Sequence, residues 1–217
     1  MSSTSICGVA IPDSRIAREA TELLRAASSD LLFDHSVRVY FWAALGGKRK
    51  ALRYDPELLY VGAMFHDFGL TAAYRSSQLR FEVDGADAAR AFLRGHGIDE
   101  QDIDKVWAAI ALHTTPGIPQ FLQPEIALLH AAAGMDVAGR NHGDFSAEER
   151  DAVTARYPRG PGFEDAMIDE FYAGLKYRPG STFGTLNADY LACRDPDFVR
   201  GDICSVMHGS PWKRCDH

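Results

Sequence analysis

An adjacent histidine and aspartate, His66 and Asp67, follow an apolar run from Leu58 to Phe65 and precede Gly69. A neutral imidazole and a carboxylate are common ligands of divalent metal ions. Burying both at the end of an apolar helix is costly unless another group compensates their polarity, and a metal ion would do so. The alternative is a hydrogen bond between the two side chains inside a helical core.

Two residues elsewhere in the chain can complete a metal site with this pair. His35 precedes the pair, and Asp136 follows it, each within a segment predicted to be helical. No short spacing rule connects the four residues, but helices of one bundle can direct side chains toward a shared interior point. Two imidazoles and two carboxylates suit a divalent transition metal whose shell is completed by water.

Helices dominate the elements that must position these residues. Caps, glycines, prolines and apolar spacing predict helices at residues 14–24, 30–45, 56–65, 84–95, 99–113, 124–139, 146–155, 163–176 and 188–193. Residues 68–83 are predicted to form a loop, and no segment shows the alternation of a strand. The sequence therefore predicts an all-α bundle of about six to nine helices.

Length and charge limit the classes of function. The chain has 217 residues, which suits one domain at 1–217, with a metal-binding core at about 30–140 and a helical extension with an irregular tail at 141–217. A net charge of −7 argues against a nucleic-acid partner, and no apolar run is long enough to cross a membrane. The N-terminus lacks signal-peptide features, so we expect a cytoplasmic protein with reduced thiols, a C-terminal disulfide being left open.

The order His35, His66-Asp67, Asp136 resembles the HD-domain superfamily of metal-dependent hydrolases, and most closely its cyanamide hydratase-like branch. The stretches that carry the resemblance span about residues 11–140 and are 11–13 (IPD), 35–40 (HSVRVY), 65–71 (FHDFGLT), 80–86 (RFEVDGA), 110–115 (IALHTT) and 134–137 (GMDV). The resemblance implies an all-α HD-domain bundle in which these four residues hold one divalent transition metal. Zinc is the leading candidate, with iron, manganese and nickel as alternatives. It also implies hydration of a small nitrile-like substrate, cyanamide to urea being the leading case.

Two positions depart from the wider superfamily. Many phosphohydrolase members carry a lysine three residues after the HD aspartate, where this chain has Leu70, and this removes a cation suited to phosphate. Two-metal members place a histidine shortly before the Gly-Ala that opens the next helix, and residues 81–84 contain none. One metal is therefore expected, although Glu82, Asp84 and His113 offer further donor atoms.

The predicted catalytic residues are Asp67 and His113. Asp67 can take a proton from water, and His113, which ends an apolar helix, can return a proton to the substrate nitrogen. The alternatives for His113 are a metal ligand or a helix end bonded to backbone carbonyls. Arg38, one turn after His35, can pair with Asp67, with substrate or with a structural partner. Glu82 can orient a ligand histidine or cap the helix that follows.

Other functions stay open on the sequence alone. They are a phosphomonoesterase or nucleotidase, a two-iron oxygenase, and a non-catalytic ligand-binding module. The expected partner is a small-molecule substrate, and self-association is left open. The remaining candidates are His130, expected to be structural, and four aromatic residues that could wall a pocket: Phe68, Tyr74, Phe81 and Trp107.

Overall fold

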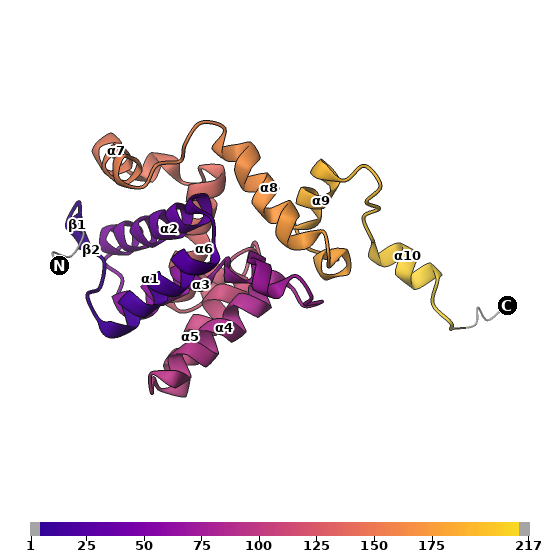
Figure 1. Ribbon diagram of the computed structural model, residues 1–217, viewed down its shortest axis with the longest axis horizontal. Helices are drawn as coiled ribbons and strands as arrows, with labels where there is room; N and C mark the ends of the chain where they lie inside the picture. Colours follow the sequence, from indigo (N-terminus) through magenta and orange to yellow (C-terminus); the bar gives the residue numbers. More distant parts are fainter. Residues whose placement is uncertain (1–4, 213–217) are drawn as a thin grey trace.

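A computed structural model describes residues 5–212 and shows a helical bundle followed by a C-terminal part that extends to one side of it (Figure 1). The α-helices are α1 (Arg15–Ala27), α2 (Asp30–Arg49), α3 (Pro56–Phe65), α4 (Phe81–Gly95), α5 (Glu100–Leu112), α6 (Pro124–Ala138), α7 (Ala147–Arg156), α8 (Phe163–Leu175), α9 (Ala188–Arg194) and α10 (Ile203–His208). Short 3-10 segments are η1 (Phe68–Leu70), η2 (Ala72–Tyr74), η3 (Pro119–Phe121), η4 (His142–Asp144) and η5 (Pro179–Thr182). An antiparallel hairpin pairs β1 (Ser5–Ile6) with β2 (Val9–Ala10). The all-α class predicted from the sequence is confirmed.

Three segments differ from the prediction, the first being the β1–β2 hairpin, for which the sequence showed no strand alternation. The sequence did not predict helix α10. Its apolar residues Ile203, Val206 and Met207 are exposed, and they do not form the apolar face by which the other helices were predicted. Helix α4 begins at Phe81 rather than at residue 84, so the predicted loop contains two 3-10 turns and the first turn of α4. The earlier start places Glu82 inside the first turn of α4, where its side chain is buried.

Helix α2 lies in the interior of the bundle and carries polar side chains into it. Ser29 caps its first turn by accepting a hydrogen bond from the backbone N–H of Leu32 at 3.2 Å. Most of its residues from Leu32 to Leu45 are buried, since the helix packs against both α3 and α6. A helix that is covered on several sides has no solvent face for its polar residues. His35 and Arg38 are consequently buried and must find partners inside the protein.

Helix α3 delivers His66 and Asp67 to the same interior. Asp55 caps it by accepting from the backbone N–H of Glu57 at 2.8 Å, and Pro56 occupies its first turn, where a missing N–H costs nothing. Every residue from Leu58 to Phe65 is buried. The helix therefore ends deep in the core, at the position of the His-Asp pair.

Glycines allow the chain beyond Asp67 to lie directly against α4. A Cβ atom on Gly69 would overlap the carbonyl oxygen of Phe81 and come within 3.0 Å of the Cβ of Asp84. A Cβ atom on Gly85 would come within 2.5 Å of the carbonyl oxygen of Phe65. Backbone thus packs on backbone here, which fixes the position of the turn that holds Asp67.

We expect Gly69→Ala to destabilise the protein, because the new methyl group meets backbone that cannot move without shifting α4. The expected loss in the free energy of unfolding is about 1–3 kcal/mol or more, the range for overpacking a close contact. Urea unfolding measures it. The matched control is Gly95→Ala at the end of α4, where an added Cβ has no neighbour within 4 Å. Equal stability of both variants would show that the turn tolerates displacement.

A second apolar cluster joins α8 and α9 to the bundle. It contains Leu70 and Phe81 from the segments around the His-Asp pair, and Phe171 and Leu191 from the C-terminal part. Gly174 allows this contact, since a Cβ there would come within 2.7 Å of the Leu70 side chain. The C-terminal part therefore packs directly on the segment that follows Asp67. None of the described helices is both long and apolar enough to span a membrane.

Candidate metal centre

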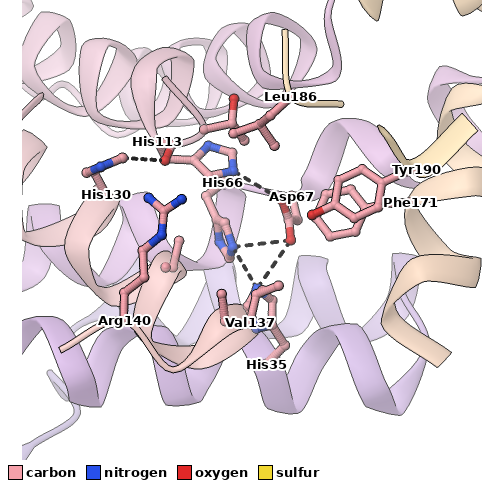
Figure 2. Close-up of a pocket in the computed structure, with 14 residues that line it drawn as sticks. His35, His66, Asp67, His113, His130, Val137, Arg140, Phe171, Leu186 and Tyr190 are labelled. Carbon is pink, nitrogen blue, oxygen red and sulfur yellow. Dashed lines mark hydrogen bonds and ion pairs between the residues drawn. The ribbon is translucent and has the colours of Figure 1, made fainter. Parts of the chain in front are cut away.

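Three buried histidines from different elements point their Nε2 atoms toward one carboxylate (Figure 2). They are His35 in α2, His66 at the end of α3 and His113 at the end of α5. Each Nδ1 atom lies 2.7 Å from an oxygen acceptor, which is the Asp136 carboxylate for His35 and a backbone carbonyl for the other two. A neutral imidazole that donates its Nδ1–H leaves a free lone pair on Nε2. All three Nε2 atoms are therefore available as acceptors or ligands.

The carboxylate at the centre of this arrangement is Asp67. Its Oδ2 atom lies 3.4 Å from His35 Nε2 and 3.2 Å from His66 Nε2, and its Oδ1 atom lies 3.4 Å from His113 Nε2. Asp67 is buried, and neither of its oxygens has a hydrogen-bond partner among the described residues. A buried carboxylate that faces imidazole lone pairs requires a cation to offset its cost.

The spacing of these atoms fits one divalent metal. The two Nε2 atoms of His35 and His66 lie 3.1 Å apart, and ligand atoms of His35, His66 and Asp67 all lie within 4.8 Å of one another. Ligands bound at about 2.0–2.1 Å with tetrahedral angles would lie about 3.3 Å apart. The three residues thus form a group that could hold a metal ion, and His113 lies on the other side of the carboxylate, outside that group.

The ionisation states of Asp67 and His66 agree with ligand chemistry. Burial acts to raise the pKa of the Asp67 carboxyl, but the neighbouring imidazoles of His66, His113 and His35 outweigh it and hold that pKa well below its usual range. Burial lowers the pKa of His66. For His35 burial acts in the same direction, but the nearby carboxylates of Asp136 and Asp67 outweigh it and raise the pKa. Asp67 is therefore ionised and His66 neutral near pH 7, the forms that bind metal.

The structure does not bring the fourth predicted ligand, Asp136, to this space. Its Oδ2 atom lies 2.7 Å from His35 Nδ1 and accepts from Arg38 Nη2 at 2.8 Å. Its Oδ1 atom accepts from Arg38 Nε at 2.9 Å and from Trp42 Nε1 at 2.8 Å. Burial acts to raise the pKa of Asp136, but His35 and Arg38 outweigh it and hold the pKa below its usual range. Asp136 therefore orients the His35 ring by contacting Nδ1, on the side of the ring away from Nε2. Arg38 pairs with Asp136 rather than with Asp67.

Comparison with protein families agrees with this site. The family model described as HD domain matches residues 32–154, which run from α2 into α7 and contain all five residues discussed above as ligands or proton carriers. The chain belongs to the HD-domain family. A comparison with curated proteins finds no match. Membership of the HD family indicates a metal-dependent hydrolase type of enzyme, and HD domains bind divalent metals. The superfamily predicted from the sequence is thereby confirmed.

The HD site opens into a small pocket of about 100 Å³. Its lining residues come from six separate parts of the chain and are His35, His66, Asp67, His113, Thr114, His130, Ala133, Gly134, Val137, Ala138, Arg140, Phe171, Leu186 and Tyr190. Pockets for drug-sized ligands measure about 300–1,000 Å³, so this one suits a substrate of few atoms.

The pocket wall of the HD site differs from the one predicted. None of the four aromatic residues considered as walls from the sequence lines it. Phe171, Leu186 and Tyr190 do so instead, and the rings of Phe171 and Tyr190 stack with centroids 4.2 Å apart and an interplanar angle of 3°. Burial raises the pKa of Tyr190 to about 12, so its hydroxyl stays protonated. Sequence reasoning missed these residues because they lie in short segments far from the HD motif and form no pattern with it.

Glu82 and His130 stabilise residues of the HD site through hydrogen bonds. Glu82 is buried and accepts hydrogen bonds from Arg80 at 2.8 Å, from Asn187 at 2.8 Å and from the hydroxyl of Thr114. It thus holds the turn after His113, and neither of its predicted roles describes it. The Nδ1 atom of His130 lies 2.7 Å from the carbonyl oxygen of His113, so His130 has a structural role and also lines the pocket.

We expect Asp136→Asn to weaken metal binding without abolishing it. The amide leaves Arg38 without its carboxylate, and breaking a buried ion pair costs about 3–5 kcal/mol of stability. Loss of a group that orients a ligand histidine reduces metal affinity by about 10–100-fold. Competition with a metal chelator measures the affinity. Glu19→Gln, which breaks an exposed ion pair with Arg15, is the control and should change neither quantity appreciably. Complete loss of metal from Asp136→Asn would restore Asp136 as a direct ligand.

Proposed function

We propose that this HD protein is a metal-dependent hydratase that adds water to a small nitrile-like substrate, with cyanamide to urea as the leading case. The observation that carries the proposal is the buried Asp67 carboxylate, without a hydrogen-bond partner among the described residues, facing imidazole lone pairs at the edge of a pocket of about 100 Å³. His35, His66 and Asp67 would hold the metal. Zinc is the leading candidate.

The chemistry divides between the metal and the chain. A bound divalent metal lowers the pKa of water and polarises the substrate. Asp67 takes a proton from the attacking water, and His113, whose Nε2 atom lies 3.4 Å from Asp67 Oδ1, carries a proton to the substrate nitrogen. The water oxygen bonds to the nitrile carbon, and both water protons finish on the nitrogen. For cyanamide the product is urea.

Leu70 supports hydration over phosphate release. Many phosphohydrolase relatives carry a lysine at this position, and here Leu70 is buried in the apolar cluster with α8 and does not line the pocket. Gly174 lies close to Leu70, since a Cβ added at Gly174 would come within 2.7 Å of the Leu70 side chain. The position therefore serves packing and supplies no cation for phosphate.

Metal analysis followed by a substrate screen tests the proposed function. Protein purified without added metal is expected to contain about one divalent ion per chain. It should hydrate cyanamide or simple nitriles and show little phosphomonoesterase activity. A phosphomonoesterase rate of about 1 per second or more, without nitrile hydration, would contradict the proposal. Two iron ions per chain with oxygen consumption would favour an oxygenase, and ligand binding that survives metal removal would favour a binding module.

A further inference from the structure

Arg140 brings a guanidinium group to the pocket that contains the HD residues (Figure 2). It follows Gly139, which ends α6 with a φ of 65°, and its backbone N–H donates to the carbonyl of Gly134 at 3.1 Å. The side chain then lies across Gly134, where an added Cβ would come within 3.0 Å of Arg140 Cδ. The absence of a side chain at residue 134 therefore gives Arg140 a path back along α6 into the pocket.

No acidic side chain in the described chain forms an ion pair with Arg140. Three buried acids of the neighbouring elements already have arginine partners, which are Arg38 for Asp136, Arg80 for Glu82 and Arg178 for Asp84, whereas Asp67 faces the histidines. A cation after the last turn of a helix is stabilised by the helix dipole, which explains a basic residue at this position. Arg140 is exposed, so its guanidinium lies at the open side of the pocket, where it reaches both solvent and the pocket interior.

The electrostatic balance of the pocket favours an anion. A divalent metal bound to His35, His66 and Asp67 leaves one positive charge after the carboxylate is counted, and Arg140 adds a second. The other walls include Val137, Phe171 and Leu186, which supply no charge. In a partly apolar pocket, two positive charges attract an anionic group more strongly than they would in water.

The charge of Arg140 also affects the pKa values of residues on two walls of the pocket. Burial lowers the pKa of the His130 imidazole, and the charge of Arg140 acts in the same direction. Burial raises the pKa of the Tyr190 hydroxyl, and Arg140 opposes that effect. The guanidinium is therefore close enough to influence groups on either wall, as a substrate-binding cation must be.

We propose that Arg140 binds an anionic group of the substrate, so that this site acts on a small molecule bearing a carboxylate or phosphate. The inference rests on the proposed function for the bond that reacts, and it adds the group that anchors the molecule. Guanidinium binds either anion through two parallel hydrogen bonds. The small pocket favours a carboxylate-bearing nitrile, which on this inference replaces cyanamide as the leading substrate, because cyanamide has no anionic group for Arg140 to bind.

Anion binding by the metal-loaded protein tests the role of Arg140 without any turnover. Acetate and inorganic phosphate are titrated by calorimetry into wild type, Arg140→Gln and Arg140→Lys. We expect Arg140→Gln to bind at least one of them about 10- to 100-fold more weakly, the worth of a charge-assisted hydrogen bond, and Arg140→Lys to lose less. The control is Arg53→Gln, which removes the same charge from an exposed position outside the pocket and should bind as wild type.

Turnover of matched substrates identifies the anion. Cyanoacetate is compared with cyanamide, and phenyl phosphate provides the phosphate arm. A preference for cyanoacetate that Arg140→Gln abolishes through KM supports a carboxylate. The same effect on phenyl phosphate supports phosphate binding by Arg140 and counts against the proposed nitrile hydration. Equal anion binding by wild type and Arg140→Gln, or no anion binding by wild type, would overturn the inference. Weaker anion binding in Arg140→Gln with no nitrile hydration at all would reject the proposed function and leave the role of Arg140 standing.

Discussion

Replacing His66 by alanine is expected to leave the protein folded but without metal and without activity. His66 supplies an Nε2 atom 3.2 Å from Asp67 Oδ2 and 3.1 Å from His35 Nε2, so its removal leaves two of the three grouped ligands. Loss of a residue that only orients a ligand reduces metal affinity by about 10–100-fold, and loss of the ligand itself should exceed that range.

Elemental analysis and turnover measure the effect of His66→Ala. Circular dichroism and thermal unfolding check that the helices persist. The matched control is His142→Ala, which removes an exposed imidazole outside the pocket and should retain both metal and activity. A full complement of metal in His66→Ala would show that the cluster of imidazoles and carboxylate is a hydrogen-bonded core and not a metal site.

Replacing His113 by alanine is expected to retain the metal and lose about 100- to 10,000-fold in rate, the usual contribution of one general acid–base group. His113 is buried, and its Nε2 atom faces Asp67 Oδ1, whereas the grouped ligands face Oδ2. This position suits proton transfer between the carboxylate and a molecule in the pocket. It does not require direct contact with the metal.

The matched control for His113 is His96→Ala, because His96 likewise caps the end of a helix but does not line the pocket. It should retain the wild-type rate. Metal content and turnover of the two variants separate the roles of His113. A metal-free His113→Ala would make His113 a ligand, and a metal-bound, fully active variant would make it a structural helix end.

Local signals predicted the helices well where caps and buried faces agree. Asp55 and Pro56 begin α3, and Ser146 with Glu149 forms the capping box predicted for α7. The start of α4 was misplaced because Glu82 is buried through contacts with Asn187 and Thr114, which are remote in the sequence. Propensity carries no information about such partners.

Residue type identified the metal group but not the arrangement around it. His35 and Asp136 were both predicted as ligands from their chemistry. A carboxylate can contact either the metal or the Nδ1 side of a ligand imidazole, depending on the helix face that it occupies. Arg38 and Trp42 donate hydrogen bonds to Asp136 and hold it on the Nδ1 side of His35. Arg140 was missed for a related reason, since its direction depends on the missing side chain of Gly134.

The pocket is lined by residues from two parts of the chain. The metal group and His113 lie within residues 32–154, which match the HD family, whereas Phe171, Leu186 and Tyr190 lie beyond that range. The two parts meet through apolar packing at Leu70 and Phe81 and through polar contacts of Asn187 with Glu82 and of Arg178 with Asp84. A substitution at Phe171, Leu186 or Tyr190 therefore changes the wall that a substrate meets while leaving the His35, His66 and Asp67 side chains in place.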